Sequence, residues 1–255
     1  MIKAQEFVVR TGESPQAALR GEPSYVWRAG QERRLRMIAR HARLEQALVL
    51  EAGGGTGMYA RQLQERYSAR VELFDIEPDR VLQASSTTPH ALVAAAEWLP
   101  YASDRFDTVL SNEVLEHVQD DRQALQEMIR VLKPGGRAVI FCPNRWYPFE
   151  THGHFWRGRY HFGNTPLINW LPDVARNRLA PHVRAYTRRG LLNLLAGCPV
   201  RLLEMRRIYG GYDNLVRRFG WPARTMRDLL QGFEGGPLDI WGLSHFLVLE
   251  KLKSG

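Results

Sequence analysis

The sequence predicts an α/β fold in which a mostly parallel sheet is covered by helices on both faces. Short apolar runs alternate with segments of helical periodicity between about residues 47 and 141, a pattern typical of a parallel sheet. The first run ends in a cluster of glycines, as expected where a strand turns sharply toward a helix. With 255 residues, the chain is long enough for one such domain with a large core and some additions.

Each element is predicted from its own pattern. The helices are predicted from the spacing of apolar residues. In one of them Leu125, Met128 and Ile129 lie at i, i+3 and i+4, and a Lys-Pro-Gly-Gly sequence that begins at Lys133 is expected to end the helix. Further helices are expected at about residues 27–44, at the stripe formed by Tyr59, Leu63 and Tyr67, after Pro78, and at residues 187–196. The expected strands are residues 47–50, 71–76, 91–94, 106–110 and 137–141, with closing strands at 200–208 and 246–252.

Two segments interrupt this regular pattern. Residues 145–183 are rich in aromatic side chains, which a polar linker would not hold, so we interpret the segment as an ordered insertion. Residues 210–242 form a second insertion, with one short helix expected near residues 223–230. The aromatic insertion follows the fifth strand, close to the crevice where sheets of this type bind ligands.

Composition and charge limit the classes of function. The chain has no window approaching the roughly 18 apolar residues of a membrane span, its first residues lack the form of a signal peptide, and two cysteines make no disulfide framework. We therefore expect a cytoplasmic location. The net charge of +8 would suit phosphates, nucleic acid or an anionic membrane surface. The arginines form no compact basic block, so we favour a solvated face over a nucleic-acid patch.

The glycine cluster suggests a ribose-containing ligand. Its sequence is Glu51-Ala52-Gly53-Gly54-Gly55-Thr56-Gly57, and Asp75 ends the next predicted strand. Glycines let the backbone approach a ligand closely, and a carboxylate at the second strand can accept hydrogen bonds from ribose hydroxyls. A dinucleotide site would require a small residue where Met58 stands. The spacing is instead E-x-G-x-G-x-G.

Further motifs follow in a recognisable order. They are Ala96-Glu97-Trp98-Leu99-Pro100, Phe106-Asp107, Ser111-Asn112-Glu113-Val114-Leu115-Glu116-His117 and Arg130-Val131-Leu132-Lys133-Pro134-Gly135-Gly136. With the glycine motif, this series resembles the class I S-adenosylmethionine-dependent methyltransferases of the UbiE/methyltransferase type 11 group. The resemblance is strong over residues 47–144 and weaker over 187–209 and 243–252. It implies a Rossmann-like, seven-stranded, mostly parallel sheet sandwiched by helices, with an N-terminal helical lid and insertions after the fifth and sixth strands.

The resemblance also assigns roles in binding S-adenosyl-L-methionine, the implied cofactor. It places Gly53, Gly55 and Gly57 around the methionine part, Glu51 at its amino end, Asp75 at the ribose, Ile76 on the adenine, Ala96, Glu97 and Trp98 at the adenine edge, and Ser111 and Asn112 at the methionine group. In related enzymes an N-terminal helix folds over the cofactor, which suggests Tyr25 and Arg28 as further contacts, although a solvated Arg28 is an equal alternative. One departure is Ala95, where the family usually has an aspartate for the adenine amino group.

Three histidines are candidates for the chemistry. His117 follows the fourth strand and is either a general base or acceptor-pocket residue or a structural histidine that hydrogen-bonds the turn. His152 and His154 lie in the aromatic insertion, where they would line an acceptor pocket or belong to a packed cap. Together with His161 they could supply three nitrogen ligands, but their spacing matches no closed zinc motif. We therefore predict no metal from these three residues.

The resulting hypothesis is a single methyltransferase domain over residues 1–255. Its parts are a helical lid (1–46), a cofactor-binding core (47–144), an acceptor cap (145–183) and a C-terminal half of the core (184–255) with the insertion at 210–242. The expected reaction transfers a methyl group to a small-molecule or lipid-linked acceptor, with oxygen as a candidate atom. Alternatives are a nucleic-acid methyltransferase and a non-catalytic cofactor-binding protein. The aromatic and arginine-containing cap would also suit peripheral contact with an anionic membrane.

Overall fold

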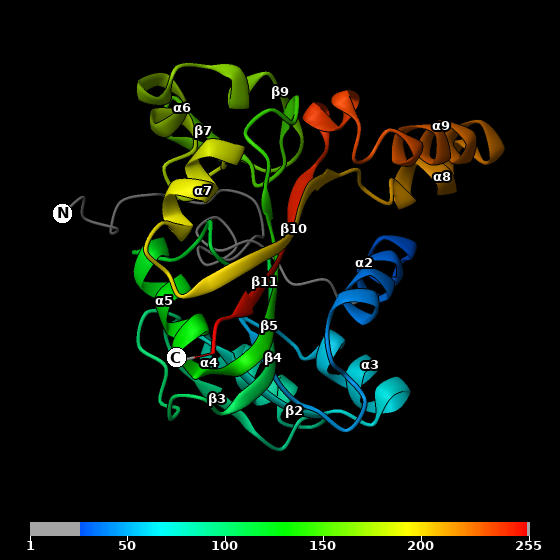
Figure 1. The fold of residues 1–255 in the computed structure, drawn as a ribbon. Helices are drawn as coiled ribbons and strands as arrows, with labels where there is room; N and C mark the ends of the chain where they lie inside the picture. Colours follow the sequence, from blue (N-terminus) through cyan, green and yellow to red (C-terminus); the bar gives the residue numbers. More distant parts are fainter. Residues whose placement is uncertain (1–25, 254–255) are drawn as a thin grey trace.

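The central feature of the molecule is a seven-stranded sheet with the order β10-β11-β5-β4-β1-β2-β3 (Figure 1). A computed structural model describes residues 26–253. Neighbouring strands are parallel except for the two pairs that involve β11, so the predicted mostly parallel sheet is confirmed. The strand bounds are Leu48–Ala52 (β1), Arg70–Asp75 (β2), Ala91–Val93 (β3), Phe106–Asn112 (β4), Leu132–Pro143 (β5), Val200–Ile208 (β10) and Ser244–Lys251 (β11).

The strand order reverses between β1 and β4. From β1 the chain continues to β2 and β3 on one side of the sheet, and it then crosses to β4 and β5 on the other side. At such a reversal the connections after the two central strands diverge, which opens a crevice at their carboxyl ends. The glycine cluster follows β1 and the Ser111-Asn112-Glu113 segment follows β4, so both motifs reach this crevice.

Helices cover both faces of the sheet, and alternate strand residues divide the core between them. Val49 belongs to a buried apolar cluster with α2 and α3, whereas its neighbour Leu50 packs in the cluster that contains α5 and α7. This alternation follows from the two-residue period of a strand. The helix bounds are Ala29–His41 (α2), Met58–Tyr67 (α3), Pro78–Ala84 (α4), Asp121–Val131 (α5) and Arg188–Leu195 (α7).

The junction between α5 and β5 differs from the expectation. Helix α5 begins at the N-cap Asp120, whose carboxylate accepts a hydrogen bond from the Gln123 amide at 2.9 Å. Its apolar stripe is buried as predicted, and the helix ends before Lys133. Strand β5 begins immediately at Leu132 rather than at residue 137, because Leu132 already pairs with Phe106 of β4; the Lys-Pro-Gly-Gly segment forms the irregularity before the next pair, Thr108 with Arg137. The turn at Gly135 has a φ of 76°, a conformation that glycine adopts readily.

The segment 145–183 is built of small regular elements. They are the strands Phe149–Glu150 (β6), His154–Trp156 (β7), Arg159–His161 (β8) and Thr165–Pro166 (β9), the 3-10 helix Ile168–Trp170 (η1) and the helix Asp173–Leu179 (α6). A buried ion pair at 3.1 Å joins Arg176 to Glu150 inside this unit, which we call the cap. Both ends of the cap meet beside Tyr186: the Arg145 amide donates to its carbonyl at 2.8 Å, and its own amide donates to the Pro143 carbonyl at 2.9 Å.

The second insertion contains two α-helices where one short helix was predicted. They are Asp213–Phe219 (α8) and Trp221–Gly232 (α9), followed by the 3-10 helix Pro237–Trp241 (η2). Gly220, with a φ of 65°, separates the two helices. The Asp213 carboxylate accepts hydrogen bonds from the amides of Ala29 and Gly30, at 3.0 and 3.1 Å. This insertion therefore holds the start of α2.

The two insertions lie at the same end of the molecule, beyond the carboxyl end of β5 (Figure 1). Residues 1–25 fall outside the described residues, so the predicted lid is described only by α2, and Tyr25 cannot be placed. Among residues 26–253, no helix combines the length and the apolar character needed to cross a membrane.

Candidate active site

The glycine turn follows β1 and leads into α3. Gly53 adopts a φ of 58°, and a Cβ atom added there would lie 2.7 Å from a methyl group of Val114. Both the backbone conformation and the space therefore require glycine at this position. The turn passes over Glu51, whose side chain is buried at the end of β1. Burial, with a smaller contribution from the nearby Asp75 carboxylate, raises the pKa of Glu51 to about 8.

Asp75 links the end of β2 to the glycine turn. One carboxylate oxygen accepts a hydrogen bond from the Gly55 amide, and the other accepts one from the Glu77 amide, both at 2.9 Å. The side chain thus fixes the turn against the neighbouring strand. A carboxylate oxygen has more than one lone pair, so these bonds are compatible with the binding of hydroxyl groups.

A cavity of about 440 Å³ opens beside this turn. Ile76 and Trp98 form apolar walls near its mouth, where they are 43% and 74% exposed. Two apolar side chains and a hydrogen-bonding carboxylate suit a flat heterocycle joined to a sugar. Of the predicted cofactor residues, the walls include Gly53, Asp75, Ile76, Ala96, Glu97 and Trp98.

The end of β4 is held by an arginine from α2. Arg34 donates hydrogen bonds to Asn112 Oδ1 at 2.6 Å and to Glu113 Oε1 at 2.7 Å. Glu113 has a φ of 58°, which turns the chain sharply after the strand. Burial opposes ionisation of the Glu113 carboxyl, but Arg34, together with Glu116, His152 and Ser244, lowers the pKa to about 2. This fixed carboxylate was not predicted as a site residue, although it lies within the Asn-Glu-Val-Leu-Glu-His motif.

Glu113 lines three cavities. It borders the cavity beside the glycine turn and a second one of about 230 Å³ beneath the cap, which Tyr147, Phe149 and His152 also line. A third cavity, of about 290 Å³, lies against α2 and includes Arg34 and Asn112. The first two cavities therefore meet at the carboxyl end of β4.

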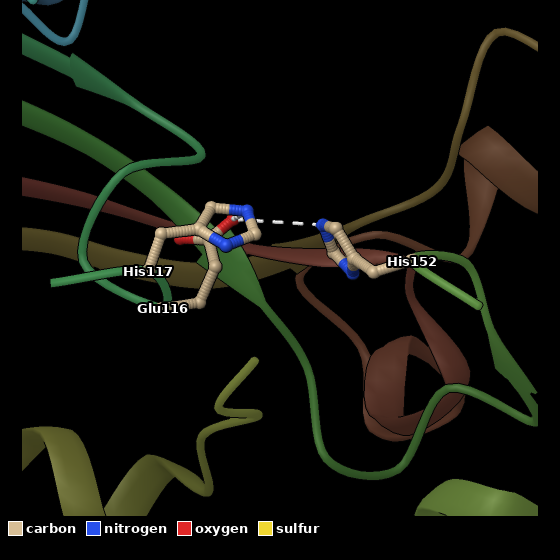
Figure 2. A group of neighbouring side chains, drawn as sticks. All are labelled: Glu116, His117 and His152. Atoms are coloured by element: carbon tan, nitrogen blue, oxygen red, sulfur yellow. Dashed lines mark ion pairs between the residues drawn. The ribbon is translucent and has the colours of Figure 1, made fainter. Parts of the chain in front are cut away.

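Glu116, His117 and His152 are neighbouring side chains (Figure 2), and His117 lines the first cavity while His152 lines the second. One Glu116 oxygen is 3.9 Å from His117 Nε2 and 3.8 Å from His152 Nε2, and the imidazole rings contact each other edge to face at 5.2 Å. Burial, with a smaller contribution from His152, lowers the pKa of His117 to about 3, so His117 is neutral at physiological pH. Burial, followed by the Glu113 charge, raises the pKa of Glu116 well above its usual range.

His154 does not join this group. It lies on β7 opposite His161, with the two rings stacked at 5.2 Å, and its Nδ1 is 3.0 Å from the Thr165 hydroxyl. Of the three histidines proposed for the chemistry, the structure thus brings together His117 and His152. The sequence could not predict which of these histidines come together, because the cap approaches the end of β4 only through tertiary contacts.

Comparisons with known proteins agree with this geometry. Residues 50–140 match the family model described as a methyltransferase domain. A ubiquinone/menaquinone biosynthesis C-methyltransferase, UbiE, from Laribacter hongkongensis is 39% identical over 139 residues, which cover 51% of this chain and 54% of that protein. An uncharacterized methyltransferase from Mycolicibacterium vanbaalenii is 34% identical over 110 residues, covering 41% of this chain and 42% of that protein.

The fold is similar to that of solved structures over a longer stretch. The S-adenosylmethionine-dependent methyltransferase from Mesorhizobium loti superimposes with a TM-score of 0.60, at 17% identity, over 88% of this chain and 98% of that one. Residues 50–140 therefore carry a methyltransferase domain. This confirms the predicted relationship over that part of the chain, and S-adenosylmethionine is the cofactor named for the Mesorhizobium loti neighbour. The chain spans about half or less of the length of the curated relatives just described.

Several predicted cofactor residues of the methyltransferase domain also have structural roles in the fold. Glu97 points its carboxylate at the loop before α5, where it accepts hydrogen bonds from the Gln119 and Asp120 amides at 2.7 and 3.2 Å. It positions a cavity-lining loop, and this contact could not be foreseen because its partners lie more than 20 residues away. Gly55 and Gly57 form the turn itself, and Ser111 is fully buried at the end of β4.

Arg28 occupies the N-cap position of α2 and is exposed. Its backbone amide donates to the Gln31 side chain at 3.1 Å, and the residue is not part of the wall of the cavity beside the glycine turn. Its pairing with a methionine carboxylate therefore stays a prediction. Asp120 and Gln123, which the sequence did not single out, do line this cavity. They add polar groups to the same wall as Ala95, which stands where the family usually has an aspartate.

Proposed function

We propose that this protein transfers a methyl group from S-adenosylmethionine to a hydroxyl-bearing small-molecule or lipid-linked acceptor. The observation that carries the proposal is the shared wall at Glu113 between the cavity beside the glycine turn and the cavity beneath the cap. Methyl transfer needs the donor carbon and the acceptor atom in line and in contact. Two adjoining cavities, one on the core and one under the insertion, suit a cofactor and an acceptor that meet at β4.

The residues around the first cavity fit the cofactor. The Gly53 position has no room for a side chain, and the turn is already fixed by Asp75. In the proposed complex Asp75 binds the ribose, Ile76 packs on the adenine, and Ser111 and Asn112 face the methionine group. When bound, the sulfonium supplies an activated methyl group, so the protein contributes orientation and exclusion of water.

The second cavity suits an acceptor whose hydroxyl loses a proton. His117 lines one cavity and His152 the other, and His152 is the proposed proton acceptor, with the neutral His117 beside it. Deprotonation of a phenol or enol increases electron density at both the oxygen and the adjacent ring carbon. The same residues could therefore serve methylation at oxygen, or at carbon as in the relative named a C-methyltransferase.

Calorimetric titration tests cofactor binding first. We expect wild type to bind S-adenosylmethionine and its demethylated product, and Gly55→Val to lose binding because the side chain would enter the ligand's path. Equal affinity of the two proteins would contradict the site, and a preference for NAD would contradict the family relationship. Transfer of labelled methyl groups to hydroxylated aromatics, lipid extract and RNA then distinguishes the acceptor classes, and binding without any transfer would indicate a non-catalytic protein.

The outer surface of the cap supports a proposal on where the acceptor comes from. Large apolar side chains are exposed there, namely Trp146, Phe149, Trp156, Phe162, Leu167, Trp170 and Val174. Tryptophan is favoured at membrane interfaces, and Arg157 and Arg159 lie in the same segment. We propose that the cap touches an anionic membrane that holds a lipid-linked acceptor. Salt-sensitive co-sedimentation with anionic vesicles, reduced by Trp156→Ser, would support this contact, and its absence would limit the acceptor to soluble molecules.

A further inference from the structure

We propose that Glu116, His117 and His152 bind a divalent first-row transition cation. Two imidazoles and one carboxylate form a ligand set that zinc and iron sites use with positions left open for other ligands. The set joins a motif after β4 to a residue of the cap (Figure 2). It differs from the group of His152, His154 and His161 that the sequence suggested.

The geometry of the three side chains is close to that of a coordinated ion. The ligand atoms all lie within 4.8 Å of one another, and the Glu116 oxygen is 3.9 and 3.8 Å from the two imidazole nitrogens. Bonds of about 2.0–2.2 Å to a tetrahedral ion place neighbouring ligand atoms about 3.4 Å apart. Small side-chain rotations would therefore close the set around a cation.

The burial of Glu116 supports the same conclusion. The residue is 1% exposed, and within residues 26–253 neither of its carboxylate oxygens has a hydrogen-bond partner. A buried polar group without a partner costs about 1–3 kcal/mol, and an ionised one costs more. A cation would satisfy the carboxylate and would organise the imidazoles around it.

The surroundings of His152 are those of a metal ligand. Its Nδ1 lies 3.2 Å from Glu150 Oε1, which leaves Nε2 directed at Glu116. A carboxylate that orients the outer nitrogen of a histidine is the usual arrangement around metal sites. Glu150 is itself fixed by Arg176. The cap therefore presents this nitrogen in a defined direction.

A cation here would have access to both cavities, because His117 lines one and His152 lines the other. This use rests on the proposed function. With the cation bound, His117 and His152 would act as its ligands, so the acceptor oxygen would coordinate the cation and release its proton to solvent rather than to a histidine. The oxygen, or the ring carbon conjugated with it, would then form the new bond to the methyl carbon, while the bond between carbon and sulfur breaks and its electron pair stays on sulfur.

The test measures cation binding to the whole chain without cofactor or acceptor, so its result does not depend on methyl transfer. After treatment with a chelator, Zn²⁺ is titrated calorimetrically, and Co²⁺ is titrated by its visible absorption. We expect saturable binding of a single ion. Glu116→Gln and His152→Ala should lower the affinity by at least about tenfold, whereas the matched control His154→Ala should bind as wild type does.

Each outcome bears on the proposal. Circular dichroism establishes that the variants are folded, and Glu116→Gln keeps the shape of the side chain, so lost binding there reports on the ligand itself. Equal affinity of wild type and both ligand variants would overturn the site. So would the absence of saturable Zn²⁺ or Co²⁺ binding in wild type, or a preference for Mg²⁺, which favours oxygen ligands. In those cases Glu116 is a protonated structural carboxyl.

Discussion

Asp75 is the residue in which the structural and the proposed binding roles coincide. Its carboxylate accepts amide hydrogen bonds from Gly55 and Glu77, so it shapes the turn that would receive the cofactor. The sequence identified this residue from its place at the end of an apolar run. The amide partners follow from the folded turn, and sequence reasoning did not anticipate them.

We predict that Asp75→Ala weakens S-adenosylmethionine binding by about 1.5–3 kcal/mol, the range for a hydrogen bond that involves a charged group. Asp75→Asn should lose less, because its amide oxygen still accepts one hydrogen bond. Calorimetric titration measures both, and Asp79→Ala, on the exposed first turn of α4, is the control. An unchanged dissociation constant in folded Asp75→Ala would assign the ribose to another residue.

The buried carboxyl of Glu51 predicts a pH dependence of stability. Its pKa rises from 4.5 to about 8 on folding, so the folded state holds the proton more tightly. The stabilisation is complete at low pH, below the unfolded pKa, and is lost as the pH rises through about 8. One pKa unit corresponds to about 1.4 kcal/mol. The variant Glu51→Gln resembles the neutral carboxyl and should therefore be more stable than wild type, by more than about 1 kcal/mol, in alkaline buffer.

Urea unfolding in mildly acidic and in alkaline buffer measures this difference for the cofactor-free protein. The two proteins should be closer in stability in acid than in alkali. The exposed Glu65→Gln, on the neighbouring helix α3, is the control and should follow wild type throughout. Parallel stability curves for wild type and Glu51→Gln would show that Glu51 is ionised in the folded protein.

At the scale of elements, the turn between β1 and α3 depends on space as well as on backbone conformation. A Cβ atom at Gly53 would clash with Val114, which follows β4. Gly158, in the cap hairpin, has a similar positive φ of 75° with nothing within 4 Å. Substitutions at Gly53 and Gly158 therefore separate the free-energy cost of a left-handed backbone conformation from the cost of a steric clash.

We expect Gly53→Ala to destabilise the protein more than Gly158→Ala does, and to reduce cofactor affinity, because Val114 or the turn must move. The left-handed conformation alone costs about 1–2 kcal/mol, which is the upper range expected for the control. Thermal unfolding and calorimetric titration of both variants provide the measurements. If both variants lose the same stability and retain affinity, the turn tolerates the displacement of Val114.

Helices and strands could be predicted where one hydrophobic periodicity extends through the whole element. The apolar stripe of α5 placed the helix correctly, since burial of one face decides its position. The second insertion was less predictable: Gly220 divides it into α8 and α9, and a glycine within a polar stretch does not distinguish a break from a loop. The cap strands β6 and β9 have two residues each, too few for any period to be recognised.

At the scale of the whole molecule, the cap has its own buried support. Arg176 forms the ion pair with Glu150, donates to the Val183 carbonyl at 2.8 Å and approaches Asn169 at 3.3 Å. These contacts lie within the insertion rather than between it and the sheet. The mostly parallel character of the sheet could be predicted from sequence, whereas this internal support could not, because its members are separated by irregular chain.

We predict that Arg176→Met loosens the cap and leaves the sheet folded. Removing one partner of a buried ion pair costs about 3–5 kcal/mol, and the contacts broken lie within residues 145–183. Hydrogen exchange should increase in the cap, turnover should fall, and S-adenosylmethionine affinity should remain close to that of wild type. Arg178→Met, an exposed neighbour on α6, is the control. Loss of cofactor binding by a folded Arg176→Met protein would make the cap part of the cofactor site.

The two ends of the cap meet at Tyr186, whose backbone is hydrogen-bonded to both Pro143 and Arg145. The sheet therefore closes this loop whatever the loop contains. Doubling the length of a flexible loop with fixed ends adds only about 0.6 kcal/mol of closure entropy. A longer, shorter or exchanged insertion would thus leave the thermodynamics of the core almost unchanged. Exchange of the cap could therefore alter the acceptor preference while the residues of the cofactor cavity stay the same.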